Sequence, residues 1–453
     1  MTPVAAQQDA VSYYHKLMED PAVFSDEHVA QLQERMRQER VVFGERYLCP
    51  FLRPHFITER QFSYVNDVTR IILSAVKKVE NLALTVPALQ DALDLTPREK
   101  ELVKVDNRYG KASPTSRMDT FLTEDSFYFV EYNAECPAGI AYNDKLLKIF
   151  LDQPIMKRFQ DRFPLRAMYS MEKVYDCLVG SYRKWGGTKA HPTIAITDWR
   201  EVPTYVEFEY FKQLFEERGC QTIICDPRTF ELHDGKLYHD KTQVDIVYKR
   251  VLSTELFEKE AEVQTLLDAY RQQAACFINS FRCKLLHKKL LFAVLQLPEM
   301  TKHFTPAEAK AVRDHIPWTH QVVEGKVDHF GDNIDLLPWI LKHRNNLVLK
   351  PNDEYGGKGI YIGWDLDDAA WEKALQVARQ APPGHVYLVQ ERVKTSREDF
   401  PDRERNVAPR YVDLDPFIFD DGITGFLTRL SDTSLCNVTS GGGQVPTFIL
   451  QGG

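Results

Sequence analysis

The chain has 453 residues, about three times the length of a typical single domain, so we expect two or three domains. Hydrophobic residues make up 43% and charged residues 27%, a balance that excludes a disordered or collagen-like chain. The formal net charge of −8 argues against a protein that binds nucleic acid through bulk positive charge. No stretch approaches the roughly 20 apolar residues of a membrane span, and the N-terminus has no signal-peptide pattern. We therefore expect a cytoplasmic protein with neither nucleic acid nor a membrane as partner.

The first hundred residues are expected to be mostly helical, because 28–47 and 69–83 carry apolar residues at a spacing of three to four. Residues 115–133 change to a period of two, which is typical of strands. This alternation predicts one strand face with Phe127, Phe129, Glu131 and Asn133 and another with Tyr128, Val130 and Tyr132.

Residues 165–280 alternate between strand and helix patterns and include a hairpin, TFELHDGKLYHD, with Asp-Gly at its turn. This order predicts a small α/β unit. Residues 281–320 look helical, and KLLHKKLLFAVLQL is their clearest apolar run. From 345 the chain returns to strands, and the weak boundaries fall near 160 and 280.

The eight cysteines are scattered, without a CxxC pair or a histidine at zinc spacing, so ordinary reduced core thiols are expected. Cys49 lies in RYLCPFLRP, which has no local signature of an activated nucleophile, and we expect it to be structural.

The segment SRMDTFLTEDSFYFVEYNAECPAG is the most informative stretch. If a hairpin turns at residues 124–126, position 119 faces 131, position 117 faces 133 and position 121 faces 129. Facing residues are cross-strand neighbours, so Arg117, Asp119, Glu131 and Asn133 would converge on one patch. Carboxylate and amide oxygens suit Mg²⁺, and an arginine can stabilise charge on a transferring phosphoryl group. The alternative is a solvated polar hairpin face.

A second constellation is LVLKPNDEYGGKGIYIGW. Lys350 ends an apolar strand, and a glycine-rich loop then leads into a further strand, an arrangement that can lay backbone N–H groups on phosphates. The loop is no Walker A motif, and a plain hairpin turn also explains it. The strand HVYLVQERV follows, and its end at Gln390, Glu391 and Val393 suits the edge of an adenine ring.

Together these segments resemble the circularly permuted ATP-grasp superfamily, in particular the glutathionylspermidine synthetase-like carboxylate–amine ligases. The metal half comes last in ordinary ATP-grasp proteins, whereas here it stands at 117–133, ahead of Lys350. The resemblance covers roughly 105–453 and implies an α+β fold, a circularly permuted ATP-grasp with a small α/β pre-ATP-grasp-like domain. Its domains would be 1–160 (a helical region plus the metal half), 161–280 (the small α/β domain) and 281–453 (the nucleotide half with its lid).

The resemblance also implies roles for individual residues. Asp119, Glu131 and Asn133 would hold Mg²⁺, and Arg117 would sit on the γ-phosphate of ATP. The nucleotide set would be Lys350 on the α and β phosphates, Lys358 with Gly356, Gly357 and Gly359 as the lid, and Gln390, Glu391 and Val393 at the adenine. The family has an earlier nucleotide lysine, for which the chain offers Lys284, Lys288 and Lys289, and we favour Lys289.

Some candidates stay open. A metal half in conventional order, at the C-terminal end, could be imitated by Asp413, Asp415, Arg429 and Asn437. Contact with a phosphate or carboxylate group, or a purely structural role, also explains Arg429 and the turn 441–443. Glu135 and Asn143 could meet an ammonium or amide group, or belong to a polar loop. Arg250 could clamp an acceptor carboxylate, or be an ordinary surface arginine.

The resemblance implies an Mg²⁺- and ATP-dependent ligase that joins a small carboxylate to an amine, an amino acid or a peptide through an acylphosphate, releasing ADP. The alternatives are an ATP-binding scaffold or regulatory protein without activity, and a small-molecule kinase. The sequence specifies neither the substrates nor the oligomeric state.

Overall fold

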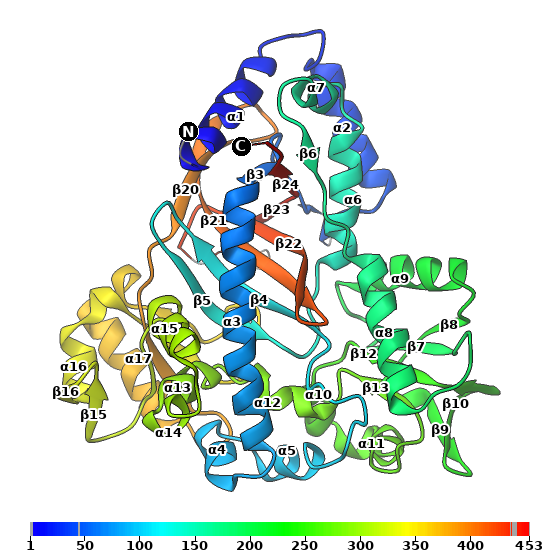
Figure 1. Ribbon diagram of the computed structural model, residues 1–453, viewed down its shortest axis with the longest axis vertical. Helices are drawn as coiled ribbons and strands as arrows, with labels where there is room; N and C mark the ends of the chain where they lie inside the picture. Colours follow the sequence, from blue (N-terminus) through cyan, green and yellow to red (C-terminus); the bar gives the residue numbers. More distant parts are fainter. Residues whose placement is uncertain (1–2, 44–45, 435, 437–441, 453) are drawn as a thin grey trace.

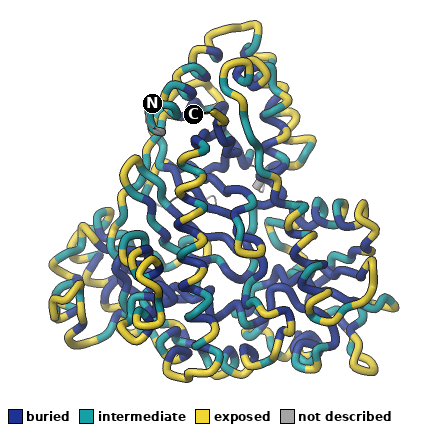
Figure 2. Tube along the Cα trace, in the orientation of Figure 1, coloured by how far each residue is buried: buried dark blue, intermediate teal, exposed yellow. Residues whose placement is uncertain are grey.

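The computed structural model describes residues 3–43, 46–434, 436 and 442–452. Figure 1 shows a central sheet with one long helix lying across it along the long axis of the molecule. The molecule is narrower at the top of this view and has a lobe on each side at the bottom. In Figure 2 the buried residues gather in the middle of the molecule, and the exposed ones lie on the outer helices and loops. The fold class is α+β, as expected.

The central sheet joins segments from both ends of the chain. Its strands run in the order β23, β22, β21, β4, β5, and β20 pairs with β21. The strands are β4 (Thr115–Leu122), β5 (Phe127–Asn133), β20 (Ser396–Pro401), β21 (Val407–Phe419), β22 (Gly422–Ser431) and β23 (Gly443–Val445). Antiparallel pairing sets Phe417 of β21 opposite Arg117 of β4. The predicted metal hairpin is thus continued by strands from the far end of the chain.

The long helix α3 (Glu59–Ala83) covers one face of this sheet (Figure 1). Thr58 caps its N-terminus by accepting from the backbone N–H of Gln61, whose side chain in turn accepts from the N–H of Thr58. The buried stripe of the helix packs in one core with Met118 and Phe129 of the hairpin. Helical periodicity in the sequence anticipated the inner face of this helix.

A β-bulge interrupts the hairpin and corrects two expectations. Asp119 faces Glu131 and Arg117 faces Asn133 as predicted, but the register shifts after Asp119, so Phe121 faces Tyr128 instead of Phe129. The extra residue, Val130, moves Phe129 to the face that packs on α3. The prediction that Phe127 and Phe129 share a face with Glu131 and Asn133 is therefore wrong.

A smaller parallel sheet, in the order β13, β12, β7, β8, lies between 171 and 280. Its strands are β7 (Ile194–Thr197), β8 (Thr222–Cys225), β12 (Ile246–Lys249) and β13 (Cys276–Ile278). Its helices are α8 (Met171–Trp185), α9 (Tyr205–Glu217), α10 (Ser253–Glu258) and α11 (Gln264–Arg271). The predicted hairpin is present as β9 (Phe230–His233) and β10 (Lys236–His239), next to β11 (Thr242–Val244), and Asp234 and Gly235 both have positive φ at its turn.

A third sheet, antiparallel, follows in the order β14, β19, β17, β18. It consists of β14 (Thr319–Gln321), β17 (Leu347–Pro351), β18 (Tyr361–Ile362) and β19 (Tyr387–Glu391). Two helices, α16 (Leu336–Lys342) and α17 (Asp368–Gln380), share its core, in which Trp371 packs with Leu349 and Val389. This sheet carries the predicted lysine strand and the predicted adenine strand side by side.

The segment 281–320 is not one helical run. It contains η3 (Phe281–Cys283), α12 (Lys284–His287), α13 (Leu291–Gln296), α14 (Pro298–Thr301) and α15 (Pro306–His315). The run breaks at Lys288, which is extended, and Asn352 accepts hydrogen bonds from the N–H groups of Lys289 and Leu290. Contacts with a distant loop therefore override the helical pattern.

The upper part in Figure 1 brings the start and the end of the described chain together. Strand β24 (Thr447–Leu450) lies between β3 (His55–Thr58), to which it is parallel, and β6 (Leu165–Arg166). A shared core joins these strands to the helices α1 (Pro3–Leu17), α2 (Asp26–Gln38), α6 (Ile140–Leu151) and α7 (Pro154–Gln160).

The remaining elements are short. They are α4 (Pro87–Ala92), α5 (Pro97–Leu102), β1 (Val42–Phe43), β2 (Arg46–Tyr47), β15 (Lys326–His329), β16 (Asp332–Asp335), η1 (Pro227–Thr229), η2 (Glu260–Glu262), η4 (Arg344–Asn346) and η5 (Gly363–Asp365). None of the described helices is both long and apolar enough to cross a membrane. The cysteines are free thiols, all buried except the half-buried Cys136, and burial raises the pKa of Cys49 to about 12.

Candidate active site

A cleft lies between the central sheet and the third sheet. Strands β4, β5, β21 and β22 line one side of it, and β17, β18 and the end of β19 line the other. Of the predicted site residues, those in its lining are Asp119, Glu131, Lys350, Gln390, Glu391 and Val393. The structure thus brings the predicted metal half and the predicted nucleotide half to one place.

The cross-strand pairing places the predicted metal ligands together. Asn133 Nδ2 donates to Asp119 Oδ1 at 2.7 Å, and Glu131 is the cross-strand partner of Asp119. Arg117 Nε also donates to Asp119 Oδ1, at 3.0 Å. The described residues hold no group of three or more His, Cys, Asp or Glu side chains arranged for a metal ion. Two carboxylates and one amide still fit Mg²⁺, which usually completes its shell with waters and phosphate oxygens.

The second candidate set converges on the same point. Arg429 is the cross-strand partner of Asp413, and its Nη2 lies 2.6 Å from Asp413 Oδ2 and 2.7 Å from Asp119 Oδ2. Asp415 Oδ2 lies 2.8 Å from the same nitrogen. The sets 117–133 and 413–429, treated as alternatives from sequence, therefore form one cluster. Asn437 and residue 441 lie outside the described part of the chain.

The cluster is buried and combines three aspartates with Arg117 and Arg429, and burial raises the pKa of Asp415 well above its usual range. Burial and the neighbouring carboxylate of Asp119 raise the pKa of Asp413 to about 6, against the opposing effect of Arg429. Burial also disfavours ionisation of Asp119, but Arg117 and Arg429 hold its pKa well below the usual range. A carboxylate that stays ionised beside arginines suits a site for a cation and phosphate groups.

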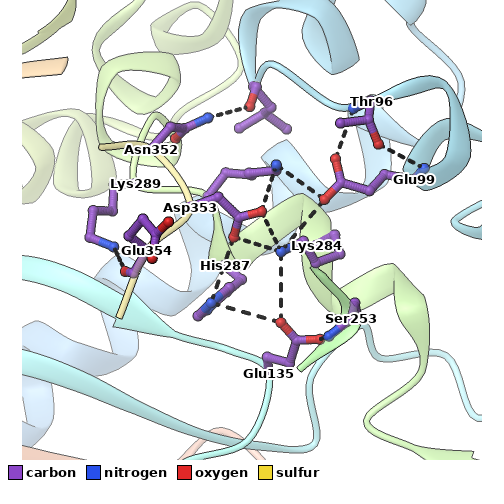
Figure 3. A network of polar contacts seen from close by, with 12 residues as sticks. Thr96, Glu99, Glu135, Ser253, Lys284, His287, Lys289, Asn352, Asp353 and Glu354 are labelled. Atoms are coloured by element: carbon purple, nitrogen blue, oxygen red, sulfur yellow. Dashed lines mark hydrogen bonds and ion pairs between the residues drawn. The ribbon is translucent and has the colours of Figure 1, made fainter. Parts of the chain in front are cut away.

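The three candidate lysines have different surroundings, and Figure 3 shows two of them, Lys284 and Lys289, from close by. Lys284 Nζ lies 2.6 Å from Asp353 Oδ1, and Lys288 Nζ lies 2.8 Å from Asp353 Oδ2 and 3.1 Å from Glu99 Oε1. Both are therefore held in a buried ion network. Lys289 Nζ instead donates to the carbonyl of Glu354 and lies 3.5 Å from Glu131 Oε1. Of the three, Lys289 is the one next to the predicted metal ligands.

Lys350 enters the cleft from β17. Its Nζ donates to Gln390 Oε1 at 2.7 Å and to the carbonyl of Val130 at 3.3 Å. Burial lowers the pKa of Lys350 to about 8, although the Glu131 carboxylate opposes this shift. A buried ammonium group without a direct ion pair is costly, and an anionic ligand would relieve that cost.

The glycine-rich loop stands outside the cleft lining. Gly356, Gly357 and Gly359 have positive φ, so the turn between β17 and β18 depends on glycine. Lys358 is exposed and pairs with Glu354 at 3.4 Å. The loop leans towards the smaller parallel sheet, because Tyr355 Oη lies 3.3 Å from Glu255 of α10. The structure therefore does not bring the predicted lid residues onto the cleft.

Sequence reasoning missed most of the apolar cleft wall. This wall is formed by Phe121, Val130, Val348, Ile360, Ile362, Trp364 and Tyr411. Arg392 lies over the Trp364 ring, 4.1 Å from its centroid, and Glu391 Oε1 is 2.9 Å from His329 Nε2. The alternation of side chains along β21 could have indicated that Tyr411 and Asp413 lie on the same face of the sheet.

Three further candidates are buried, and structural contacts hold two of them, Glu135 and Arg250. Glu135 is buried, and its Oε1 lies 2.7 Å from Lys249 Nζ and 2.6 Å from the N–H of Ser253. Arg250 is also buried, with Nη1 donating to the carbonyl of Pro137 and Nη2 3.2 Å from Glu207 Oε2, so it is no surface arginine. The side chain of Asn143 is buried in α6. None of the three lines the cleft.

The fold and the cleft define a protein with two β-rich halves that meet over a cluster of acidic and basic side chains. The sequence profile described as "Circularly permuted ATP-grasp type 2" matches residues 99–431. The chain belongs to this family, which confirms the resemblance drawn from the two motifs.

Curated relatives and one solved structure are similar to the chain. An uncharacterized protein of Mycobacterium tuberculosis (strain ATCC 25618 / H37Rv) is 24% identical over 345 residues, and one of Mycobacterium leprae (strain TN) is 22% identical over 344 residues. The matches cover 72% of this chain but only 58% and 57% of these relatives. The apo structure of a glutathione synthetase-like effector from Globodera pallida has a TM-score of 0.61 and 12% identity, covering 96% of this chain and 99% of that one. This last likeness concerns the fold.

Proposed function

We propose that the protein is an ATP- and Mg²⁺-dependent carboxylate–amine ligase that forms ADP and an amide bond. The observation that carries the proposal is the meeting of Asp119, Glu131 and Lys350 in the lining of one cleft, with Lys289 Nζ 3.5 Å from Glu131 Oε1. Membership of the ATP-grasp family supports the same reaction class.

In this proposal Asp119, Glu131 and Asn133 hold the cation, which when bound neutralises phosphate charge. Lys289 and Lys350 bind phosphate oxygens of ATP, and the apolar wall with Gln390, Glu391 and Val393 holds the adenine. Arg117 and Arg429 are the cationic groups nearest to Asp119 and would stabilise charge on the transferring phosphoryl group.

The reaction proceeds in two transfers. The substrate carboxylate attacks the γ-phosphorus of ATP, the bond to the β-γ bridging oxygen breaks, and ADP leaves. The amine then attacks the acylphosphate carbonyl, expels phosphate and loses a proton. The protein mainly positions the reactants and neutralises charge, so no covalent enzyme nucleophile is needed. We propose that the loop with Gly356, Gly357, Lys358 and Gly359 closes over the phosphates and protects the acylphosphate from water.

The test is ADP release by the purified protein with Mg-ATP and a panel of amino acids, short peptides and polyamines, with product masses measured in parallel. A product lighter by one water than its two substrates, with one ADP per product, would support the ligase and name its substrates. ADP with a phosphorylated acid or alcohol and no amide would favour a kinase. ATP binding without turnover of any pool would favour a scaffold.

A further inference from the structure

Arg429 is fixed in the wall of the candidate active site by carboxyl groups from two strands. Asp413 accepts from the backbone N–H of Arg429 at 2.9 Å and from its Nε at 2.8 Å. Nη2 of the same guanidinium lies 2.7 Å from Asp119 Oδ2 and 2.8 Å from Asp415 Oδ2. These contacts use Nε and Nη2, and Nη1 takes part in none of them. Since Arg429 lines the cleft with its side chain 13% exposed, the edge with Nη1 is the part left for a ligand.

Asp415 supports this arginine from inside the sheet. It is fully buried and does not belong to the described lining of the cleft. Its Oδ1 accepts from the backbone N–H of Thr120 at 2.9 Å, and its Oδ2 lies 4.0 Å from Arg117 Nε as well as close to Arg429. One carboxyl group thus connects the backbone of β4 to the guanidinium that lines the cleft.

The contact with Thr120 falls at the β-bulge of the hairpin. The register between β4 and β5 shifts at this residue, and the ladder between β4 and β21 covers only Thr115–Arg117, so Asp415 supplies the acceptor for the Thr120 N–H. On the other strand of the bulge, the carbonyl of Val130 accepts from Lys350 Nζ at 3.3 Å. Bulges are frequent next to active sites, where they change the direction of a side chain. This bulge is held by Asp415 at one strand and contacts the cleft lysine at the other.

We propose that Asp415 is a positioning residue, which holds Arg429 Nη2 and the bulge at Thr120 in one place and so orients the arginine towards the terminal phosphate of ATP. Arginine–phosphate hydrogen bonds are directional, so a displaced guanidinium loses the terminal phosphate first. The proposal rests on the proposed function only in that ATP binds in the cleft, and it does not require that an amide is formed.

The test compares binding of Mg-ADP with binding of the Mg complex of AMP-PNP, a non-hydrolysable ATP analogue, by isothermal titration calorimetry on the full chain. The unchanged protein should bind the AMP-PNP complex about tenfold more tightly, and this preference reports contacts to the terminal phosphate. A carboxyl group in either protonation state has two oxygens that can accept, whereas an amide has one. Asp415→Asn should therefore remove most of the preference and leave the Kd for Mg-ADP within about twofold.

Two further variants separate positioning from stability. Arg429→Gln should remove the preference to the same extent, and adding Asp415→Asn to it should change nothing more, because the aspartate acts through the arginine. Ser116→Ala is the matched control: Ser116 is also buried on β4, and its Oγ donates to the carbonyl of Ile418 on β21 at 3.2 Å. It lies on the opposite face of β4 from Arg117, so its loss should leave the preference unchanged.

Far-UV circular dichroism and the melting temperature establish that each variant folds. Asp415→Ser, whose hydroxyl is too short to reach Arg429, is the second variant and should show the same loss of preference. The proposal is overturned if either folded variant keeps the preference, if Ser116→Ala loses it equally, or if Asp415→Asn acts further on Arg429→Gln. Loss of the fold in both Asp415 variants would overturn it too, because the role would then be structural. An unchanged protein that binds both nucleotides equally would overturn this inference alone, whereas one that binds neither would also overturn the proposed function.

Discussion

Arg429 is the residue whose position sequence reasoning could not supply. Its guanidinium joins Asp119, Asp413 and Asp415 across three strands, with separations of 2.6 to 2.8 Å. The two-residue spacing within 117–133 was enough to predict the pairs 117/133 and 119/131, because both lie in one hairpin. Partners from residues 413–429 depend on which strands become neighbours, and no local pattern encodes that choice.

The metal assignment is tested by Glu131→Ala and Asn133→Ala. Each change removes one proposed oxygen ligand near the cleft, so ADP formation should fall at least about 100-fold. Far-UV circular dichroism and the melting temperature should stay near those of the unchanged protein. Glu124→Ala, in the exposed turn of the same hairpin, is the control and should keep full activity. Full activity in either of the first two variants would exclude this hairpin as the cation site.

Lys350 should show a conflict between stability and function. Its pKa in the folded state, about 8, lies below the value of 10.5 for an unperturbed lysine, so the unfolded chain holds more proton between pH 8 and 10.5. The resulting penalty is fully present below pH 8 and disappears as the pH rises towards 10.5. Lys350→Met should therefore raise the free energy of unfolding at pH 7 by about 1–3 kcal/mol.

The measurement is urea unfolding at pH 7 and pH 10, together with Mg-ATP binding. The stability gain of Lys350→Met should shrink at the higher pH, and ATP binding should be weakened. A gain that is equal at both pH values would contradict the assigned pKa, and unchanged ATP binding would remove Lys350 from the nucleotide site.

At the scale of elements, the glycine-rich loop offers a matched pair of substitutions. Gly356 and Gly359 both have positive φ, so alanine costs roughly 1–2 kcal/mol of backbone energy at either position. A Cβ on Gly359 would also lie 2.9 Å from Tyr387 Oη and 3.3 Å from Pro351 Cγ, whereas one on Gly356 meets nothing within 4 Å. Gly359→Ala should raise the KM for ATP more than Gly356→Ala. Equal effects would mean that packing against β17 and β19 does not position the loop.

The ion network in Figure 3 holds Asp353, which lies between β17 and the glycines of that loop. Asp353 contacts the ammonium groups of Lys284 and Lys288, and these two lysines have almost no exposure. Asp353→Ala leaves two buried cations short of a partner, so the free energy of unfolding should fall by about 3–5 kcal/mol in urea titrations. Lys358→Ala, on the exposed part of the same loop, should leave that free energy unchanged. A loss below about 1 kcal/mol for Asp353→Ala would show that Glu99 and Glu135 compensate for it.

Most elements could be predicted from sequence because their periodicity is local. Local sequence patterns of this kind mark the hairpin at Asp234 and Gly235, the parallel strands of the smaller sheet and the strands after 345. The break at Lys288 could not be predicted, since it depends on the contact of Leu290 with the distant Asn352. The bulge at Val130 could not be predicted either, because the alternation of residues 127–133 continues through it without a visible signal. The division at 160 and 280 stays a prediction.

At the scale of the whole molecule, the ends of the described chain meet. Gln7 of α1 donates to the carbonyl of Phe56, and Phe56 is the β-bridge partner of Phe448. We therefore expect a circularly permuted variant to fold, in which residues 303–453 come first, followed by a flexible glycine-serine linker and residues 1–302. Its new ends lie in the exposed segment at 302–303. Its melting temperature should fall by only a few degrees, and it should bind Mg-ATP. If the variant is unfolded, forms a molten globule or does not bind Mg-ATP, the peptide bond between residues 302 and 303 is required for folding.

The central sheet combines strands from distant parts of the chain, and this affects how the protein folds during translation. A ribosome releases β4 and β5 early, but the neighbour of β4 in the finished sheet, β21, begins only at Val407. Until then Asp119 lacks Arg429, and β4 presents an unpaired edge of the kind that promotes aggregation. Closure over such a long sequence separation is slow. The nascent hairpin thus remains incomplete for most of translation, and the cleft with its lining from β21 and β22 is assembled only when nearly the whole described chain has left the ribosome.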